Sequence, residues 1–225
     1  MAETDPQTPR MLITAGPTHE PIDAVRYLAN RSSGRMGLAL AEAAMGRGWP
    51  TTLLLGPTHL QPPQSTLLAL DRFRTTADLQ RLLTLHWHAH DVLIMAAAVS
   101  DYRPTHTDPT GKLPRTDDPL TIEFEPTPDL LAELAPTTRG DQTVIGFALE
   151  PPDRLADSAR RKMLRKRLDA IVANPLQTMD SETVTARLFL RHGEVLTCPP
   201  KLTKPDFAAW LMGQIEAMRR PRPGR

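Results

Sequence analysis

The chain is poor in cysteine, in aromatic residues and in net charge, and each shortage excludes a class of protein. A single cysteine, Cys198, excludes an internal disulfide framework and a zinc site built from cysteines. Aromatic residues make up 4% of the sequence, too few for the stacking surface that single-stranded nucleic acid requires. The formal net charge of +1 gives no electrostatic reason to expect nucleic acid or an anionic membrane as a partner.

Long apolar stretches are missing as well. No run of roughly 18 apolar residues is present, and the N-terminus lacks a basic stretch followed by an apolar one. We therefore expect a cytoplasmic protein that does not enter a membrane. Its 225 residues suffice for one large domain with a substantial core. Residues 1–9 and 219–225 are expected to be flexible, which leaves a single domain over residues 10–218.

Apolar strand-like segments alternate with helical ones along this domain. Near-continuous apolar strands are typical of a parallel sheet with helices on both faces. The alternation predicts a doubly wound, Rossmann-like α/β fold with a mostly parallel sheet. The predicted strands are 11–15, 51–55, 91–97, 144–148 and 171–173, and the predicted helices are 36–47, 76–86, 129–135 and 154–167.

Two segments depart from this alternation. Residues 101–125 are rich in proline and predict a long flap that leads into an added strand at 121–125. Residues 184–190 and 194–197 predict a β-hairpin around His192 and Gly193, followed by a closing helix over 205–218.

The segment 30–37 carries the clearest functional signal. It contains Ser33 and Gly34, follows the first strand, and opens a helix of small residues. A turn rich in Gly and Ser at a helix start leaves backbone N–H groups free for phosphate. The segment therefore predicts a nucleotide or a phosphorylated substrate. It matches neither the Gly-x-Gly-x-x-Gly dinucleotide fingerprint nor the Gly-Lys-Ser/Thr ending of a P-loop.

Other candidates follow the same strands. Residues 21–29 predict a short helix with Arg26 and Asn30 on one face; the alternative is a surface cation and a helix cap. Asp101, after the small residues that end the third strand, predicts a ligand for a metal or a ribose hydroxyl, or else a solvated carboxylate beside tight packing. Lys112 in the flap is a candidate phosphate clamp, although lone loop lysines are usually solvated.

The helix 154–167 is strongly basic. Lys162 and Lys166 lie four positions apart, so their ammonium groups can converge on one polyanion. The more common explanation of such a charge run is a solvated helix face. Phe147, at the end of the preceding strand, is a candidate to stack on a base at the same edge.

Three alternating histidines, His86, His88 and His90, would share one face of an extended strand and resemble a metal site. A helix end that runs into a loop is the preferred interpretation, so we predict no metal site there. The sequence offers no Ser–His–Asp or Cys–His arrangement.

Taken together, these residues resemble the phosphopantothenoylcysteine synthetase (phosphopantothenate–cysteine ligase) family. In many bacteria this is the C-terminal half of a bifunctional flavoprotein of coenzyme A biosynthesis. The resemblance runs from about Met11 to Trp210 and rests on blocks at 14–23, 25–37, 95–103, 127–131, 144–148 and 159–174. No block of the flavin-dependent decarboxylase half is present, so no flavin is expected in this chain.

The resemblance implies a two-step ligation. The carboxylate of 4′-phosphopantothenate attacks the α-phosphate of a nucleoside triphosphate, CTP in most bacterial members, and pyrophosphate leaves. The amine of L-cysteine then displaces the nucleotide monophosphate from the acyl-nucleotidylate and forms the amide. The resemblance also implies Mg²⁺ and a homodimer, with a separate phosphopantothenoylcysteine decarboxylase as a candidate partner.

The family's functional residues carry over by position. Asn30 would contact the acyl-nucleotidylate, with Arg26 holding the same region, and Asp101 would bind the nucleotide or its Mg²⁺. Lys162 and Lys166 would grip phosphates, while Lys112 would lie on a flap that closes over the site and can reach a neighbouring subunit. The other expected nucleotide-binding residues are Gly16, Ser33, Gly34, Ala97, Pro128, Asp129, Leu130, Leu131 and Phe147.

Two departures from the family pattern concern the first turn and the flap. Pro17 stands where the family usually has a second glycine, and the flap reads Lys112-Leu113-Pro114-Arg115 instead of Lys-x-Lys-Lys. An NAD(P)-dependent oxidoreductase is an alternative, although both the glycine fingerprint and a Tyr-x-x-x-Lys pair are missing. A second alternative is a nucleotide-binding partner of a decarboxylase without activity of its own. The choice between CTP and ATP stays open.

Overall fold

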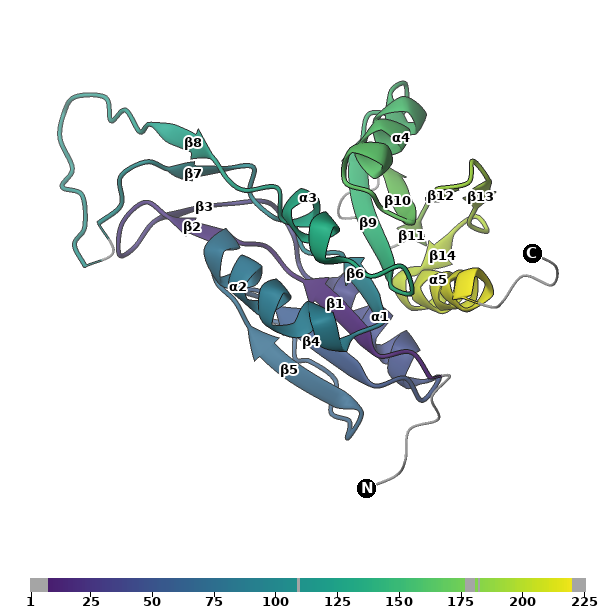
Figure 1. The fold of residues 1–225 in the computed structure, drawn as a ribbon. Coiled ribbons are helices and arrows are strands. Elements are labelled where there is room, and N and C mark those ends of the chain that lie inside the picture. Colours follow the sequence, from purple (N-terminus) through teal and green to yellow (C-terminus); the bar gives the residue numbers. More distant parts are fainter. Residues whose placement is uncertain (1–7, 109, 177–180, 182, 220–225) are drawn as a thin grey trace.

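The computed structural model describes residues 8–108, 110–176, 181 and 183–219 (Figure 1). Most of the two predicted flexible ends, residues 1–7 and 220–225, therefore lies outside the described residues. Within the described part, Pro9 is buried and Arg219 ends the last helix.

An eight-stranded sheet forms the centre of the molecule, with the strand order β13–β12–β10–β9–β6–β1–β4–β5. All neighbouring strands from β10 to β5 pair in parallel, whereas β12 pairs antiparallel with both β10 and β13. The predicted doubly wound, mostly parallel sheet is therefore confirmed. Its strands are β1 (Met11–Ala15), β4 (Thr51–Leu55), β5 (Leu68–Arg72), β6 (Val92–Met95), β9 (Thr143–Glu150), β10 (Ala170–Pro175), β12 (Arg187–Leu190) and β13 (Val195–Thr197).

Helices cover both faces of this sheet (Figure 1). One face packs against α1 (Arg35–Met45) and α5 (Lys204–Arg219), around residues such as Leu40 and Phe207. The other face packs against α2 (Thr76–His86), α3 (Leu130–Leu134) and α4 (Leu155–Arg165), with the short 3₁₀ turns η1 (Trp87–Ala89) and η2 (Ala135–Thr137). Because side chains alternate along each strand, the buried strands supply both cores.

The predicted helix at 21–29 is wrong. Residues there form an antiparallel hairpin of β2 (His19–Pro21) and β3 (Tyr27–Ala29). The carboxylate of Asp23 accepts hydrogen bonds from the backbone amides of Val25 and Arg26, at 2.9 and 2.7 Å, and so closes the turn. Arg26 therefore lies in the hairpin turn, and Asn30 follows β3, rather than both sharing a helical face.

A second antiparallel pair, β7 (Tyr102–Pro104) and β8 (Phe124–Pro126), frames the long predicted flap. The added strand predicted at 121–125 is thus shifted by a few residues to β8. We use the term arm for β2, β3 and the turn between them, together with β7, β8 and the described part of the loop between β7 and β8. The arm projects from the sheet on the side away from α4 (Figure 1).

The C-terminal predictions agree with the structure. The predicted hairpin is formed by β12 and β13, and the closing helix is α5. The expected first run, 184–190, is interrupted, because β11 (Thr183–Val184) pairs instead with β14 (Leu202–Thr203).

The three alternating histidines mark a helix end, as the preferred interpretation predicted. His86 ends α2 and lies 2.7 Å from Asp71 Oδ2, and His88 lies in η1. His90 is buried and contacts the Thr52 hydroxyl at 2.8 Å. In the described part of the chain, no group of three or more His, Cys, Asp or Glu side chains is arranged to hold a metal.

Within the described residues, no helix has both the length and the apolar character needed to cross a membrane.

Gly37 generates a first prediction, because α1 approaches β1 closely at this residue. A methyl group at Gly37 would lie 2.3 Å from Ala15 Cβ and 3.1 Å from the Thr14 carbonyl oxygen. We expect Gly37→Ala to lower the free energy of unfolding by about 1–3 kcal/mol, although alanine favours helix more than glycine. Urea unfolding measures this, with Gly140→Ala as the control, since a methyl there meets no atom within 4 Å. Equal stability of Gly37→Ala and the wild type would contradict the prediction.

Candidate active site

The order of the strands defines a crevice between β1 and β6. After β1 the chain continues to β4 on one side, whereas after β6 it continues to β9 on the other. In open α/β sheets, ligands bind where the strand order reverses, beyond the carboxyl ends of the strands. The exits of β1 and β6 are therefore the expected position of a ligand.

Backbone hydrogen bonds tie these two exits together. Ala98 N donates to Gly16 O at 2.9 Å, and Thr18 N donates to Ala98 O at 3.2 Å. The Thr14 hydroxyl accepts from Ala97 N at 3.0 Å. Gly16 has a φ of 82°, a left-handed conformation that glycine adopts without strain. Gly16 and Ala97, both predicted site residues, are thus fixed side by side.

The N-terminus of α1 lies directly against this pair. Gly34 is the N-cap residue with a φ of 78°, and a Cβ there would lie 3.4 Å from Gly16 N. Among the described residues, no side chain makes an N-cap hydrogen bond to α1, and its first turn carries no acidic residue. Gly34 N and Arg35 N donate weakly to the Ser32 and Ser33 hydroxyls, at 3.4 and 3.5 Å, which leaves the next amides of the first turn open. Free amides and the helix dipole together favour an anion at this position.

Asn30 and Asp101 lie at the same edge. Asn30 Nδ2 donates to Val99 O, in the loop after β6, at 2.8 Å. Asp101 has an exposed side chain, and its backbone oxygen accepts from Thr127 N at 3.0 Å. This bond brings Pro128 and Asp129, the next residues along the chain, to the same edge.

The two basic residues of α4 are paired with carboxylates. Lys162 Nζ lies 2.5 Å from Glu150 Oε1, and Lys166 Nζ lies 3.0 Å from Asp129 Oδ1. The Asp129 carboxylate also accepts from Ala132 N at 3.3 Å, capping α3, and contacts Arg165 at 3.3 Å. Asp129 thus links the edge after β6 to α4, and its side chain is already engaged.

Three predicted residues of the base pocket face different environments. Leu130 and Leu131 are buried in the core beneath α2, α3 and α4, so their side chains pack the fold instead of lining an open edge. Phe147 packs against the opposite core, with α1 and α5. It therefore lies across the sheet from Lys162 and Lys166, not beside them.

Arg26 and Lys112 are brought together, but away from the other site residues. Ala24 N donates to Gly111 O at 2.9 Å, and Leu113 N donates to Asp23 Oδ2 at 3.1 Å. These bonds strap the loop around Lys112 to the hairpin turn that contains Arg26. Both residues therefore lie in the outer part of the arm, which projects away from α4 (Figure 1).

Asp23 is the anchor of this strap. Its side chain is fully buried and forms an ion pair with Arg26 Nη2 at 2.5 Å. The Arg26 guanidinium, together with the amides of Arg26, Val25 and Leu113, holds the pKa of Asp23 well below its usual range, although burial opposes the shift. The carboxylate is therefore charged throughout the neutral range.

Sequence reasoning missed a buried network behind the edge. Glu20 Oε1 accepts from the Thr76 amide at 2.8 Å and from the Thr76 hydroxyl at 2.7 Å. The Thr18 hydroxyl accepts from Ser100 N at 2.9 Å. All four side chains are buried, so the network joins the β1 exit, the start of α2 and the loop before Asp101. Thr18 and Glu20 lie two positions apart, the spacing of side chains on one face of a strand, and this spacing was the available signal in the sequence.

Asn174 was missed as well. It lies near the end of β10, on the same sheet face as Phe147, and its Oδ1 is buried without a hydrogen-bond partner in the described part of the chain. A polar residue closing an apolar strand was the only signal in the sequence.

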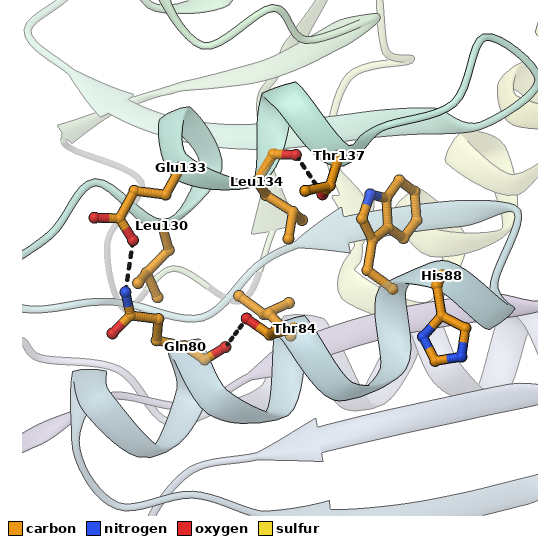
Figure 2. Close-up of a pocket in the computed structure, with 9 residues that line it drawn as sticks. Gln80, Thr84, His88, Leu130, Glu133, Leu134 and Thr137 are labelled. Atoms are coloured by element: carbon orange, nitrogen blue, oxygen red, sulfur yellow. Dashed lines mark hydrogen bonds between the residues drawn. The ribbon is translucent and has the colours of Figure 1, made fainter.

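A groove of about 380 Å³ lies elsewhere, between α2 and the α3–η2 segment (Figure 2). Leu83, Trp87 and Leu134 line its floor, and Gln80 Nε2 donates to Glu133 Oε2 across it at 2.6 Å. Of the predicted site residues only Leu130 lines this groove, so we do not assign the ligand to it.

Comparison with known proteins identifies the family. The model of the DFP family, described as "DNA/pantothenate metabolism flavoprotein C-terminal domain", matches residues 7–218. The chain belongs to this family. The resemblance to phosphopantothenoylcysteine synthetases is thereby confirmed. Among solved structures, the C-terminal domain of the coenzyme A biosynthesis bifunctional protein CoaBC superposes on this DFP chain with a TM-score of 0.79 and 36% identity, over 94% of this chain and 96% of that one.

Curated relatives of the DFP chain are longer proteins. CoaBC of Vibrio cholerae is 40% identical over 82% of this chain, and a prokaryotic protein named "Cysteine/Cysteine sulfinic acid decarboxylase" is 42% identical over 75% of it. The DFP chain spans about half the length of these relatives, 47% and 46% respectively. Their names differ although they share this half, so membership alone does not assign the activity.

Asp23 generates the second prediction. Since its folded pKa is depressed, the stabilising contribution is present above the unfolded value of about 3.9 and is lost only as the pH falls through the folded value. Asp23→Asn removes the charge at every pH and should free the loop around Lys112. We expect trypsin at pH 8 to cleave after Lys112 and Arg115 several-fold faster, followed by mass spectrometry. Asp117→Asn, an exposed change in the same loop, is the control; equal cleavage of both variants would refute the anchor.

Proposed function

We propose that this chain is a phosphopantothenate–cysteine ligase of coenzyme A biosynthesis. It joins 4′-phosphopantothenate to L-cysteine through an acyl-nucleotidylate made from CTP, and it releases pyrophosphate and CMP. The observation that carries this proposal is the meeting of a helix N-terminus without a side-chain cap, Asn30 and Asp101 at the switch point of the sheet. Membership of the DFP family supports it.

The first half-reaction brings a carboxylate to a triphosphate, so negative charge has to be neutralised. The amides at the start of α1 bind phosphate oxygens, and Lys162 and Lys166 of α4 donate from ammonium groups that Glu150 and Asp129 hold in the free chain. The pantothenate carboxylate attacks the α-phosphorus, and the bond to the β-phosphate oxygen breaks as pyrophosphate leaves. Mg²⁺ takes few protein carboxylates and several phosphate oxygens, so the single exposed Asp101 suits it, and the bound ion would supply further charge neutralisation.

In the second half-reaction, the amine of cysteine attacks the acyl carbon of the mixed anhydride, and CMP departs with the electrons of the broken C–O bond. Asn30 carries an amide donor in the loop that enters α1, next to the phosphate position. We assign it to orient the anhydride and to stabilise the negative charge that develops on the acyl oxygen.

The arm supplies its cations to a second copy of the chain. Arg26 and Lys112 lie in the outer part of the arm, remote from α4 of their own chain (Figure 1). The arm also exposes apolar side chains: Val25, Tyr27, Tyr102, Leu120 and Phe124 are 42–62% exposed. Such a concentration on one projection is typical of an interaction surface. A homodimer in which each arm reaches the partner's site explains both features.

A nucleotide-binding partner of a decarboxylase is the second candidate, because one relative of the same half carries a decarboxylase name. Such a protein would bind CTP without releasing pyrophosphate. An NAD(P)-dependent oxidoreductase would instead be stabilised by NAD(P)H, so the shift in melting temperature with either ligand separates the two classes.

The direct test, and the third prediction, measures pyrophosphate release with 4′-phosphopantothenate and each of the four nucleoside triphosphates, with and without L-cysteine. We expect release with CTP, and product only when cysteine is added. Asn30→Asp should still release pyrophosphate once per site but should form product about 100-fold more slowly, the range for the loss of one oxyanion donor. Binding of CTP without pyrophosphate release would favour the non-catalytic alternative, and normal turnover of Asn30→Asp would reject its role.

The fourth prediction tests the shared site. Lys112→Gln should slow pyrophosphate release with little change in thermal stability, because its side chain is exposed. If each arm serves the partner, mixing Asn30→Asp and Lys112→Gln chains after subunit exchange should restore about a quarter of the wild-type activity, since random pairing leaves one intact site in each hybrid dimer. The separate variants, mixed without exchange, are the control. No recovery after proven exchange would place Lys112 in its own subunit's site.

A further inference from the structure

The site that is proposed to attract polyphosphate contains anions of its own. Lys162 and Lys166 each have a carboxylate within 3.0 Å, from Glu150 and Asp129 respectively. The Glu150 side chain is 13% exposed, and that of Lys162 is 37% exposed. Both cations are therefore neutralised within the chain before any phosphate arrives.

The two carboxylates differ in what else they hold. Asp129 caps α3 and also contacts Arg165, so it has a structural task. Glu150 closes β9, and in the described part of the chain its buried Oε1 accepts no hydrogen bond of regular geometry, so its contact with Lys162 is an ion pair. Burial alone would raise the pKa of Glu150, but Lys162, the Ser158 hydroxyl and Arg161 outweigh it and lower the pKa. Glu150 thus stays charged at neutral pH, with Lys162 as its main partner.

We infer that Glu150 is an internal counter-ion that competes with the phosphates of the nucleotide for Lys162. The inference rests on the proposed function. A phosphate oxygen that binds the Lys162 ammonium either shares it with Glu150 or loosens that contact. In both cases the nearby carboxylate repels the phosphate and weakens its binding.

This competition affects substrate and product alike, because triphosphate and pyrophosphate present the same groups to Lys162. Tighter uniform binding would not accelerate the chemical step. It would slow the departure of pyrophosphate, whose return reverses the activation of the carboxylate. Glu150 therefore promotes turnover by keeping pyrophosphate weakly held.

The fifth prediction uses Glu150→Gln, which keeps the shape of the side chain and removes its charge. We expect CTP and pyrophosphate to bind about fivefold more tightly by calorimetry, the scale of a partly exposed ion pair, with pyrophosphate inhibiting at a correspondingly lower concentration. Lys162→Gln should weaken both affinities. In the Lys162→Gln background, the Glu150→Gln change should raise the affinities for CTP and pyrophosphate by less than fivefold, because the two side chains act through one contact. A merely damaged site would bind both ligands more weakly.

Asp153→Asn is the matched control. It removes the same charge three residues further on. Asp153 is 73% exposed, and its ion-pair partner is Arg154, at 3.7 Å, instead of Lys162. The affinities of Asp153→Asn for CTP and pyrophosphate should match those of the wild type. Weaker binding by Glu150→Gln, or equal tightening by Asp153→Asn, would overturn the inference. If Glu150→Gln alone does not fold, the same comparison in the Lys162→Gln background decides, and a fivefold tightening there would overturn it.

The outcomes also separate this inference from the proposed function. A wild-type chain that forms product, combined with unchanged CTP affinity of Lys162→Gln, would remove the counter-ion role and leave the ligase assignment intact. A wild-type chain that binds neither CTP nor pyrophosphate would remove both.

Discussion

The hydrogen bonds between the exits of β1 and β6 are the constraint on which the rest of this structure depends. Ala98 N to Gly16 O and Thr18 N to Ala98 O join two strands whose chains then turn to opposite sides of the sheet. Neither exit can shift alone, and Gly37 allows α1 to lie directly on β1. The start of α1, Asn30 and Asp101 therefore keep one fixed arrangement. The buried contacts of Glu20 with Thr76 support that arrangement from behind.

The pairing of cations with carboxylates is the second constraint, and it recurs at three predicted site residues in the described part of the chain. Arg26 is paired with Asp23, Lys162 with Glu150 and Lys166 with Asp129. Each cation is thus held in position by a carboxylate, which limits the rotamers it samples and the entropy lost when it meets an anion. Lys112, in the described part of the chain, takes part in no such pair. Its backbone is fixed by the strap to Asp23, while its exposed side chain is not held by any of the described carboxylates.

The sheet was predictable, apart from its half-exposed edge strand β5, because its signals are local. Apolar strands such as Val92–Met95, separated by helical segments, can hardly form anything other than a covered parallel sheet. The hairpin at 21–29 was not predictable, since Asp23 owes its turn partly to Leu113, 90 residues further on. The face on which Phe147 lies was missed for a different reason. The sequence placed Phe147 at the correct end of β9. A shift of one residue along a strand moves a side chain to the other face of the sheet, however, and only the pairing of β9 with β10 fixes the face on which Phe147 lies.

The position of the arm explains why several site residues identified from sequence do not meet within one chain. Sequence motifs record which residues belong to a site, but they do not record which copy of the chain contributes them. Here Asn30 and Asp101 are tied to the sheet, whereas Arg26 and Lys112 are tied to each other through Asp23 at the outer part of a projection. If the arm covered only its own chain, the apolar side chains of Val25, Tyr27 and Phe124 would be expected to be buried, whereas they are exposed. The same strap that separates these cations from their own site would present them, already ordered, to a neighbouring one.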